Sequence, residues 1–164
     1  MMSRFSRISL LIQAWLQAIL IDQEWWTEDD ENVAVRIENI GVTDDACARI
    51  ARVVFEGSVP VADQQCSSCA VDWIDTWRID LLECFAFEPA YSEDEGDKEV
   101  ELQELIAMVL AVYLGDPDAL SDPLVESSQT AITAVTPIAI QGGIGGYSLG
   151  IQYKRKMVKE DRVS

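Results

Sequence analysis

The chain has 164 residues, of which 49% are hydrophobic, and a formal net charge of −17 at pH 7. This length corresponds to one domain that can bury about 70% of its unfolded surface without metals or disulfides, and the apolar content excludes a disordered chain. With 29 acidic and 12 basic residues, most of the surface is unsuited to binding nucleic acid through its phosphates. A solvated surface, adaptation to high salt and a wall that repels DNA are all open explanations of the acidity.

The first predicted element is a helix at about residues 6–25, capped by Ser3 or Ser6. Its apolar side chains recur at intervals of three and four residues: Ile8, Leu11, Ile12, Trp15 and Ile19. Additional leucines widen this stripe, so the helix is expected to pack on a sheet and also to meet a neighbour. Polar residues interrupt the apolar run, so neither a signal peptide nor a membrane-spanning segment is expected.

Strands are predicted next. A short strand is expected at 33–38, and residues 40–61 form either a helical turn followed by a strand at 53–55 or one longer strand. The polar segment 62–71 has the composition of a hairpin tip, which makes the strands on either side antiparallel partners.

The longest predicted strand, at 73–87, has two alternating faces. One face carries Trp73, Trp77, Ile79, Leu81, Phe85 and Phe87, and the other carries Ile74, Thr76, Arg78, Asp80, Leu82 and Cys84. Such a strand would span roughly 50 Å. Part of it is therefore expected to project from the domain as one arm of a ribbon.

A loop is predicted at 89–98, with Asp97 as the N-cap of a second helix at 98–114 that Gly115 and Pro117 end. Two further strands are predicted at 130–140 and 147–158. The glycine-rich stretch 141–146 between them is expected to be a hairpin turn, because a phosphate loop would precede a helix and carry a lysine and a hydroxyl residue.

The predicted fold is α+β: an antiparallel or mixed sheet of four to five strands, two helices packed on one face and a projecting β-hairpin. The whole chain, 1–164, is expected to be a single domain with a short basic C-terminal extension from about residue 154. That extension contains Lys154, Arg155, Lys156, Lys159 and Arg162. It is expected either to be a solvated tail or to meet the acidic surface of an adjacent subunit or of another partner protein.

No catalytic, cofactor-binding or metal site is predicted. The chain has no histidine, and Asp72, Asp75 and Asp80 alternate between faces, although a site assembled from carboxylates across the fold stays open. Of the four cysteines only Cys66 and Cys69 are close in sequence. Free thiols are expected, with structural zinc or a disulfide as the alternative.

The order of elements resembles the tail terminator family of long-tailed bacteriophages and related viruses, small α+β proteins that form a hexameric ring closing the tail tube below the head. The resemblance covers nearly the whole chain and rests on four parts: the amphipathic first helix, VVFEGSVP followed by WIDTWRIDLLECFAF, the helix VELQELIAMVLAVYL, and the ending YSLGIQYKRK. It rests on architecture and not on a signature motif.

The resemblance implies a non-enzymatic structural virion protein of the neck, assembled in the host cytoplasm, without cofactors and without membrane contact. Its expected partners are further copies of itself, the tail tube protein and the head-completion or connector protein, with double-stranded DNA passing through the ring without specific binding. Alternatives are a head–tail joining or tail-completion protein and, from another class, a monomeric acidic binding module that mimics nucleic acid.

Two groups of site residues are predicted for the ring. Candidates for a subunit or partner interface are Trp73, Trp77, Arg78, Lys154, Arg155 and Lys156. Candidates for an acidic lumen, where like charge would keep the duplex from sticking, are Asp29, Asp30, Glu31, Glu93, Asp94 and Glu95.

Overall fold

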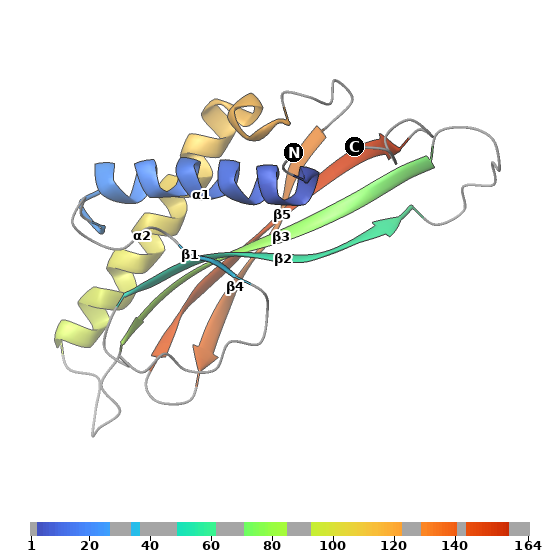
Figure 1. The fold of residues 1–164 in the computed structure, drawn as a ribbon. Helices are drawn as coiled ribbons and strands as arrows, with labels where there is room; N and C mark the ends of the chain where they lie inside the picture. Colours follow the sequence, from blue (N-terminus) through green and yellow to red (C-terminus); the bar gives the residue numbers. More distant parts are fainter. Residues whose placement is uncertain are drawn as a thin grey trace.

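The computed structural model describes residues 3–26, 34–36, 49–61, 71–84, 93–122, 129–140 and 144–157. Figure 1 shows its elements in chain order: α1 (Arg4–Asp22), β1 (Ala34–Arg36), β2 (Ile50–Pro60), β3 (Val71–Cys84), α2 (Glu93–Gly115), the 3₁₀ helix η1 (Pro117–Leu120), β4 (Gln129–Ile140) and β5 (Ile144–Met157). The predicted α+β fold is confirmed.

The strands form one five-stranded sheet with the order β1-β2-β3-β5-β4. The pairs β2–β3, β3–β5 and β5–β4 are antiparallel, and the three-residue β1 is parallel to β2. The sheet is therefore mixed. Residues 50–60 are one strand, longer than the predicted 53–55, so a helical turn does not extend to Ala51. Residues 40–48 of this region lie outside the described residues.

Strand β3 lies in the middle of the sheet and pairs with β5 along its whole length, from Val71 opposite Met157 to Cys84 opposite Ile144. It begins two residues before the predicted strand. Its pairing with β2 contains a bulge between Phe55 and Gly57, where Gly57 has a φ of 131° that favours glycine. Of the predicted hairpin tip at 62–71, Val71 belongs to β3, and residues 62–70 lie outside the described residues, as do residues 85–87 of the predicted strand.

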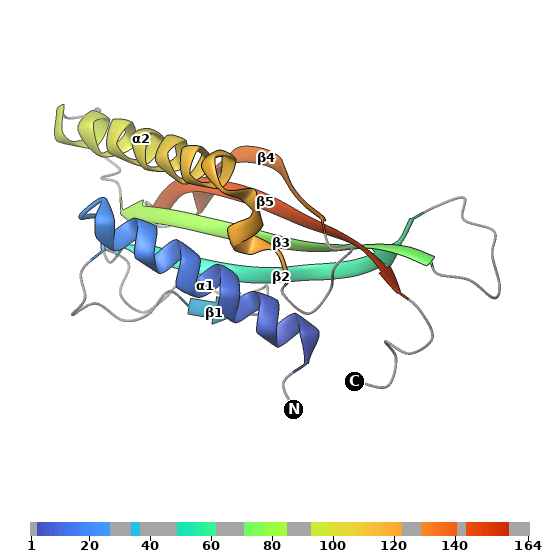
Figure 2. The same ribbon diagram turned by 90° about the horizontal axis from the view of Figure 1, so that it is seen from above.

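The core lies between the two helices and one face of the sheet. Side chains at alternate positions of the strands, such as Trp77, Leu81 and Ile151, form a single cluster with side chains from both helices. Seen from above in Figure 2, α1 runs along β2 and α2 along β5. The period-two alternation predicted for β3 therefore selects its core face.

Helix α1 begins at Arg4, because the Ser3 side chain accepts the N–H of Ser6 as a cap, and it ends earlier than predicted, at Asp22. Four apolar side chains spaced four residues apart are completely buried: Ile8, Ile12, Leu16 and Leu20. The sequence predicted no membrane-spanning segment, yet by length and composition α1 is a candidate span. Its buried stripe is the packing of a core helix, which passes the same test.

Helix α2 begins at Glu93, so residues 93–98 of the predicted loop 89–98 are helical. Asp97 lies inside the helix and is not its N-cap. The acidic residues that suggested a loop occupy the first turn of the helix, where the helix dipole stabilises negative charge. The helix ends at Gly115, as predicted.

Strands β4 and β5 form the predicted closing hairpin, but its turn is shorter than 141–146 because Gly145 and Gly146 belong to β5. Gly146 is required by packing, since a Cβ atom there would lie 1.9 Å from the carbonyl oxygen of Leu81. Strand β5 continues to Met157, so Lys154, Arg155 and Lys156 are paired with β3 and do not leave the sheet as predicted.

Candidate functional site

The predicted interface residue Trp77 is a core residue. Its side chain is fully buried, packs against Phe55 and Tyr153 with ring centroids 4.9 and 5.1 Å away, and donates its indole N–H to Ser9 Oγ at 3.0 Å. It offers no surface to a partner. An aromatic residue on an apolar strand face is compatible with a core as well as an interface, and only the tertiary packing separates the two.

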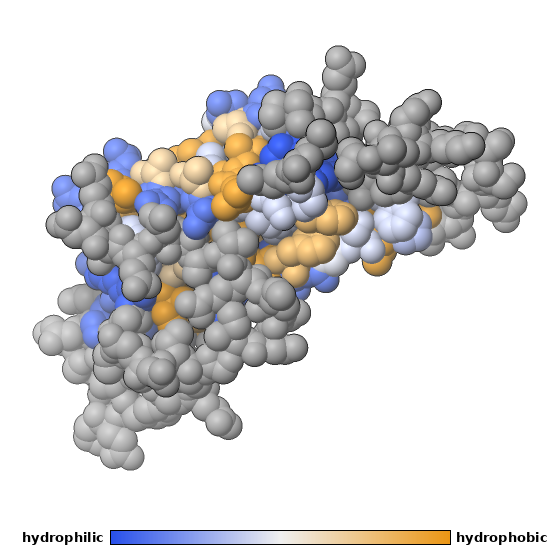
Figure 3. All heavy atoms as spheres, in the orientation of Figure 1, coloured by the Kyte–Doolittle hydropathy of each residue, from blue (hydrophilic) through white to orange (hydrophobic). Residues whose placement is uncertain are grey.

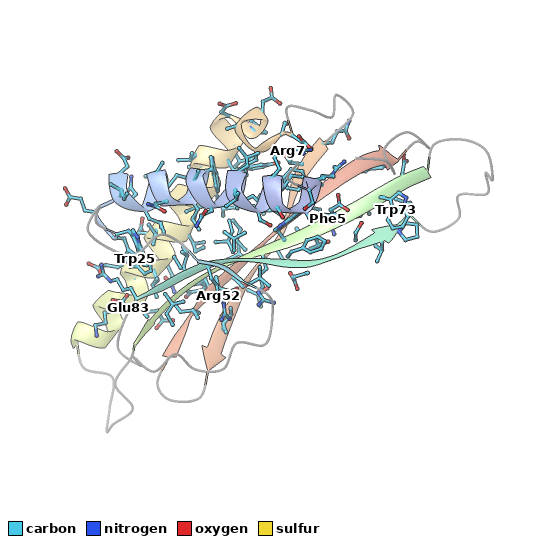
Figure 4. All side chains as sticks on the ribbon, in the orientation of Figure 1. Phe5, Arg7, Trp25, Arg52, Trp73 and Glu83 are labelled. Atoms are coloured by element: carbon cyan, nitrogen blue, oxygen red, sulfur yellow. The ribbon has the colours of Figure 1, made fainter. Side chains whose placement is uncertain are left out.

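The other predicted interface residues lie elsewhere. Half-buried Trp73 is at the far end of β3 from Glu83 (Figure 4). Arg78 is held by carboxylates of its own chain, with Nε 2.9 Å from Asp80 Oδ1. Lys154 is exposed and lies 3.9 Å from Asp72. For Arg155 and Lys156 the structure describes the backbone alone, within β5.

The predicted lumen residues fall into two groups. Asp29, Asp30 and Glu31 lie outside the described residues. Glu93, Asp94 and Glu95 form the first turn of α2, where the structure describes the backbone.

Three aspartates are buried, which the sequence did not predict: Asp75, Asp80 and Asp122. Asp80 accepts hydrogen bonds from Arg52 Nε at 2.6 Å, from Arg78 Nε at 2.9 Å and from Ser148 Oγ at 2.9 Å. A carboxylate with three donors is stabilised in its buried position. The available signal was position 75, where an aspartate lies between Trp73 and Trp77 on the strand face that also carries Ile79 and Leu81.

The other two aspartates hold the first turns of α1. Asp75 forms an ion pair with Arg4 at 3.5 Å and is hydrogen-bonded by Ser58, and Asp122 accepts from Arg7. Arg4 and Arg7 are one turn apart and therefore lie on the same side of α1. These pairs anchor the N-terminal end of α1 to the sheet and to the segment after η1.

Tyr153 lies beside this anchor and donates its hydroxyl hydrogen to the carbonyl oxygen of Leu120 at 2.7 Å. Burial raises the pKa of Tyr153 well above its usual value, the negative charge of Asp122 and then Tyr113 raise it further, and Arg4 opposes them. Tyr153 therefore stays protonated to a higher pH than an exposed tyrosine and acts as a structural donor.

A pocket of about 320 Å³ opens at the other end of α1, between that end, the start of β2 and residues 100–108 of α2. It is lined by Gln23, Glu24, Trp25, Arg49, Val100, Glu101, Glu104, Leu105 and Met108. Figure 4 places Trp25 and Glu83 at this end of the molecule. We call this cavity the acidic pocket, because three of its lining residues are glutamates.

Arg49 closes one side of the acidic pocket. It donates to the backbone oxygen of Trp25 at 2.8 Å and to Glu83 Oε1 at 3.2 Å, and its guanidinium carbon lies 5.2 Å from the centre of the Trp25 ring. Glu83 thus balances the charge of Arg49, and Arg49 orients the indole. Two buried polar atoms at this end have no hydrogen-bond partner among the described residues: Trp25 Nε1 and Glu83 Oε2.

The residues that line the acidic pocket offer carboxylates, the indole of Trp25 and apolar side chains. These groups suit a segment that carries cations, backbone carbonyl groups and apolar side chains. In the described part of the chain no three residues among histidine, cysteine, aspartate and glutamate are grouped so as to hold a metal ion. No protein-family model matches this sequence, and no curated protein matches it significantly.

Proposed function

We propose that this chain is a structural virion protein that assembles into a ring, most simply a hexamer, at the neck of a tailed virus. In this role it caps the tail tube, ends tail assembly and offers the surface on which the head connector docks. The role comes from the sequence resemblance. The structural observation that best supports this role is a large uncharged surface on a chain that is otherwise strongly acidic.

The first part of this surface is strand β4, at one edge of the sheet. Residues 129–153, which cover β4 and most of β5, contain no Asp, Glu, Lys or Arg. The outermost described strand on this side is β4, and its central residues are exposed: Thr133, Ala134, Val135, Thr136 and Pro137. The bulge between Ile132 and Val135 and the proline are features that discourage open-ended strand pairing, so side chains are the favoured means of contact.

The second part is the C-terminal half of α2. Residues 105–115 have no charge, and Met108, Val112 and Leu114 are exposed. The hydroxyl groups of Tyr113 and Thr130 are 2.9 Å apart, so this half of α2 adjoins β4. Copies that each carry a net charge of −17 repel one another, and a charge-free contact surface limits that repulsion. We call α2 from residue 105 together with β4 the neutral surface.

An apolar surface is also present on α1. Figure 3 shows hydrophobic residues along its outer side, and Leu10 is exposed there. Exposed apolar residues are present on both helices and on an edge strand. They support an oligomer over a monomer, because monomers rarely leave large contiguous apolar patches open.

Passage of DNA without strong binding is supported by five arginines whose charges are already paired with carboxylates. Arg4, Arg7, Arg49, Arg52 and Arg78 each have a carboxylate partner within 4 Å in their own chain. Cations that are already paired with carboxylates bind phosphates weakly, so a duplex passing through the ring would meet few strong contacts.

The decisive experiment removes the gene from its virus and examines the particles by electron microscopy. Unattached heads together with tails of uncontrolled length are expected, and resupply of the gene should restore normal particles. Tails of normal length that fail to join heads would indicate the joining or completion protein instead. Normal virions, combined with a monomeric purified protein, would favour the acidic binding module.

A further inference from the structure

We propose that the acidic pocket receives the basic segment 154–162 of a neighbouring copy of this chain. This segment consists of the sheet-paired end of β5 up to Met157 and the residues that follow it. The inference rests on the proposed ring and names the contact that links one subunit to the next. The segment supplies cations for the glutamates and a backbone carbonyl for the indole of Trp25, and it places the side chains of Met157 and Val158 against the apolar part of the pocket.

The pocket has unused negative charge. Glu24, Glu101 and Glu104 are exposed at its rim, and none of them has an ion pair with a basic residue that the structure describes. The positive charge inside the pocket, Arg49, is balanced by Glu83 at 3.2 Å. A cation entering the pocket is therefore attracted by three carboxylates and meets little opposing charge.

Trp25, which lines the pocket, has a buried hydrogen-bond donor that is unused. Trp25 is 6% exposed and lines the cavity, and its Nε1 has no acceptor in the described part of the chain. A buried donor without an acceptor is unfavourable, and buried polar groups in folded proteins are nearly always satisfied. A carbonyl group of an incoming extended segment would satisfy it.

Apolar surface adjoins these polar groups. Val100 is 55% exposed and Met108 is 38% exposed, and both line the pocket. The required occupant is thus basic and partly apolar. The sequence 154–162, KRKMVKEDR, has five cations and two acids around Met157 and Val158, and it is the most basic stretch of the chain.

A basic segment from the same subunit cannot reach this pocket. Arg49 is bonded to Glu83, which is opposite Gly145 at the start of β5, whereas Met157 is at the other end of that strand. Twelve residues of strand separate the two ends by about 40 Å. From Met157 to Arg162 an extended chain covers only about 18 Å. The occupant must therefore come from another copy.

A contact that joins one end of a subunit to the opposite end of the next is heterologous, and it produces a ring when the rotation between subunits closes. It also explains how highly acidic copies can associate, because each junction brings opposite charges together. The Debye length at physiological ionic strength is about 8 Å, so the contact is expected to weaken as salt is raised.

The test uses charge reversal in the full-length chain, with the oligomer followed by native mass spectrometry and light scattering. A pocket variant, Glu101→Lys with Glu104→Lys, and a segment variant, Lys159→Glu with Arg162→Glu, should each raise the concentration at half-dissociation by about tenfold or more. The matched control, Asp116→Lys with Asp118→Lys, makes the same charge change at the other end of α2 and should assemble like the parent.

Mixing the pocket variant with the segment variant is the critical step. In the mixture each reversed group can meet an oppositely charged partner, so oligomers of alternating composition should form at the parental concentration. Restoration also shows that both variants are folded. If both variants assemble normally alone, or if both fail and the mixture does not recover, the pocket contact is wrong while a parental ring still supports the proposed function. A parental chain that is monomeric overturns both proposals.

A milder variant, Trp25→Phe, keeps an aromatic ring of similar shape and removes the N–H. Because one hydrogen bond is lost, the concentration at half-dissociation should rise by about threefold to tenfold. An unchanged half-dissociation concentration would exclude the role of the indole donor.

Discussion

Arg7 holds Asp122 with two nitrogens of its guanidinium group, across 115 positions of the sequence. Nε lies 3.3 Å from Oδ1 and Nη2 lies 2.9 Å from Oδ2, and the aspartate side chain has no solvent exposure. This pair fixes the beginning of α1 to the segment that follows η1.

Removal of Arg7 should destabilise the fold. Arg7→Met leaves the carboxylate of Asp122 buried without its bidentate partner, and breaking a buried pair in this way costs about 3 kcal/mol or more. The free energy of unfolding, measured by urea titration, should fall by about that amount. Ala18→Met, at an exposed position of the same helix, serves as control and should change it by less than about 0.5 kcal/mol. Equal stability of the two variants would contradict the anchoring role.

The contact of Gly146 with Leu81 predicts a strong effect of one added methyl group. Gly146→Ala places a Cβ atom 1.9 Å from a backbone oxygen, and neither strand can move without disturbing the β3–β5 pairing. We expect a loss of about 3 kcal/mol or failure to fold. Gly115→Ala, where a Cβ meets nothing within 4 Å, is the matched control and should be tolerated. Both are measured by the midpoint of urea unfolding.

Tyr153 predicts a loss of stability at alkaline pH. Its pKa is raised in the folded state, mainly by burial, so the unfolded chain releases this proton at lower pH than the folded protein does. The associated stability is fully present below pH 10 and decreases above it, by about 1.4 kcal/mol per pH unit.

Tyr153→Phe should be less stable at neutral pH, because the bond to Leu120 is lost, and should show a smaller decline above pH 10. Urea titrations from pH 8 to 11.5 measure both effects. Tyr147→Phe removes a half-buried hydroxyl that accepts from Gln103 and is the control. A parental and a Tyr153→Phe protein that decline in parallel would argue against the raised pKa.

The neutral surface predicts that charge in the middle of β4 blocks assembly without unfolding the subunit. Val135→Lys puts a cation at a position that is 40% exposed, so its effect on the free energy of unfolding should be below about 0.5 kcal/mol. Light scattering should nevertheless show a shift toward monomers. Val59→Lys, also exposed but on β2, is the comparison. Normal assembly of the Val135→Lys protein would remove β4 from the contact.

The sequence was sufficient to predict the elements whose pattern is strong. Alternation over β3 and the buried positions Ile8, Ile12 and Ile19 of α1 follow directly from which side faces the core, so both were predicted. Leu16 and Leu20 are also fully buried, although they were expected to widen the stripe beyond the core-facing side. The start of α2 was placed too late because an acidic run is equally typical of a loop and of a first helical turn.

The ion pairs could not be predicted in the same way. Asp75 was visible as an acid between Trp73 and Trp77 on one strand face, but its partner Arg4 is on another element, and no periodicity relates the two. The acidic pocket combines the end of α1, the start of β2 and residues 100–108 of α2, which meet only after the sheet has formed. Tertiary contacts of this kind have no local signature.

The central pair of strands has a consequence for the order of folding. Strands β3 and β5 are neighbours in space, yet the chain forms α2, η1 and β4 between them, so Cys84 reaches Ile144 only after a long loop is closed. The pairs β2–β3 and β4–β5 are close in sequence and can form first as separate hairpins. Their docking then limits the rate, and folding in milliseconds to seconds is expected. Until that step the uncharged edge of β5 is open to other chains, so a nascent subunit is most prone to aggregate just before its centre closes.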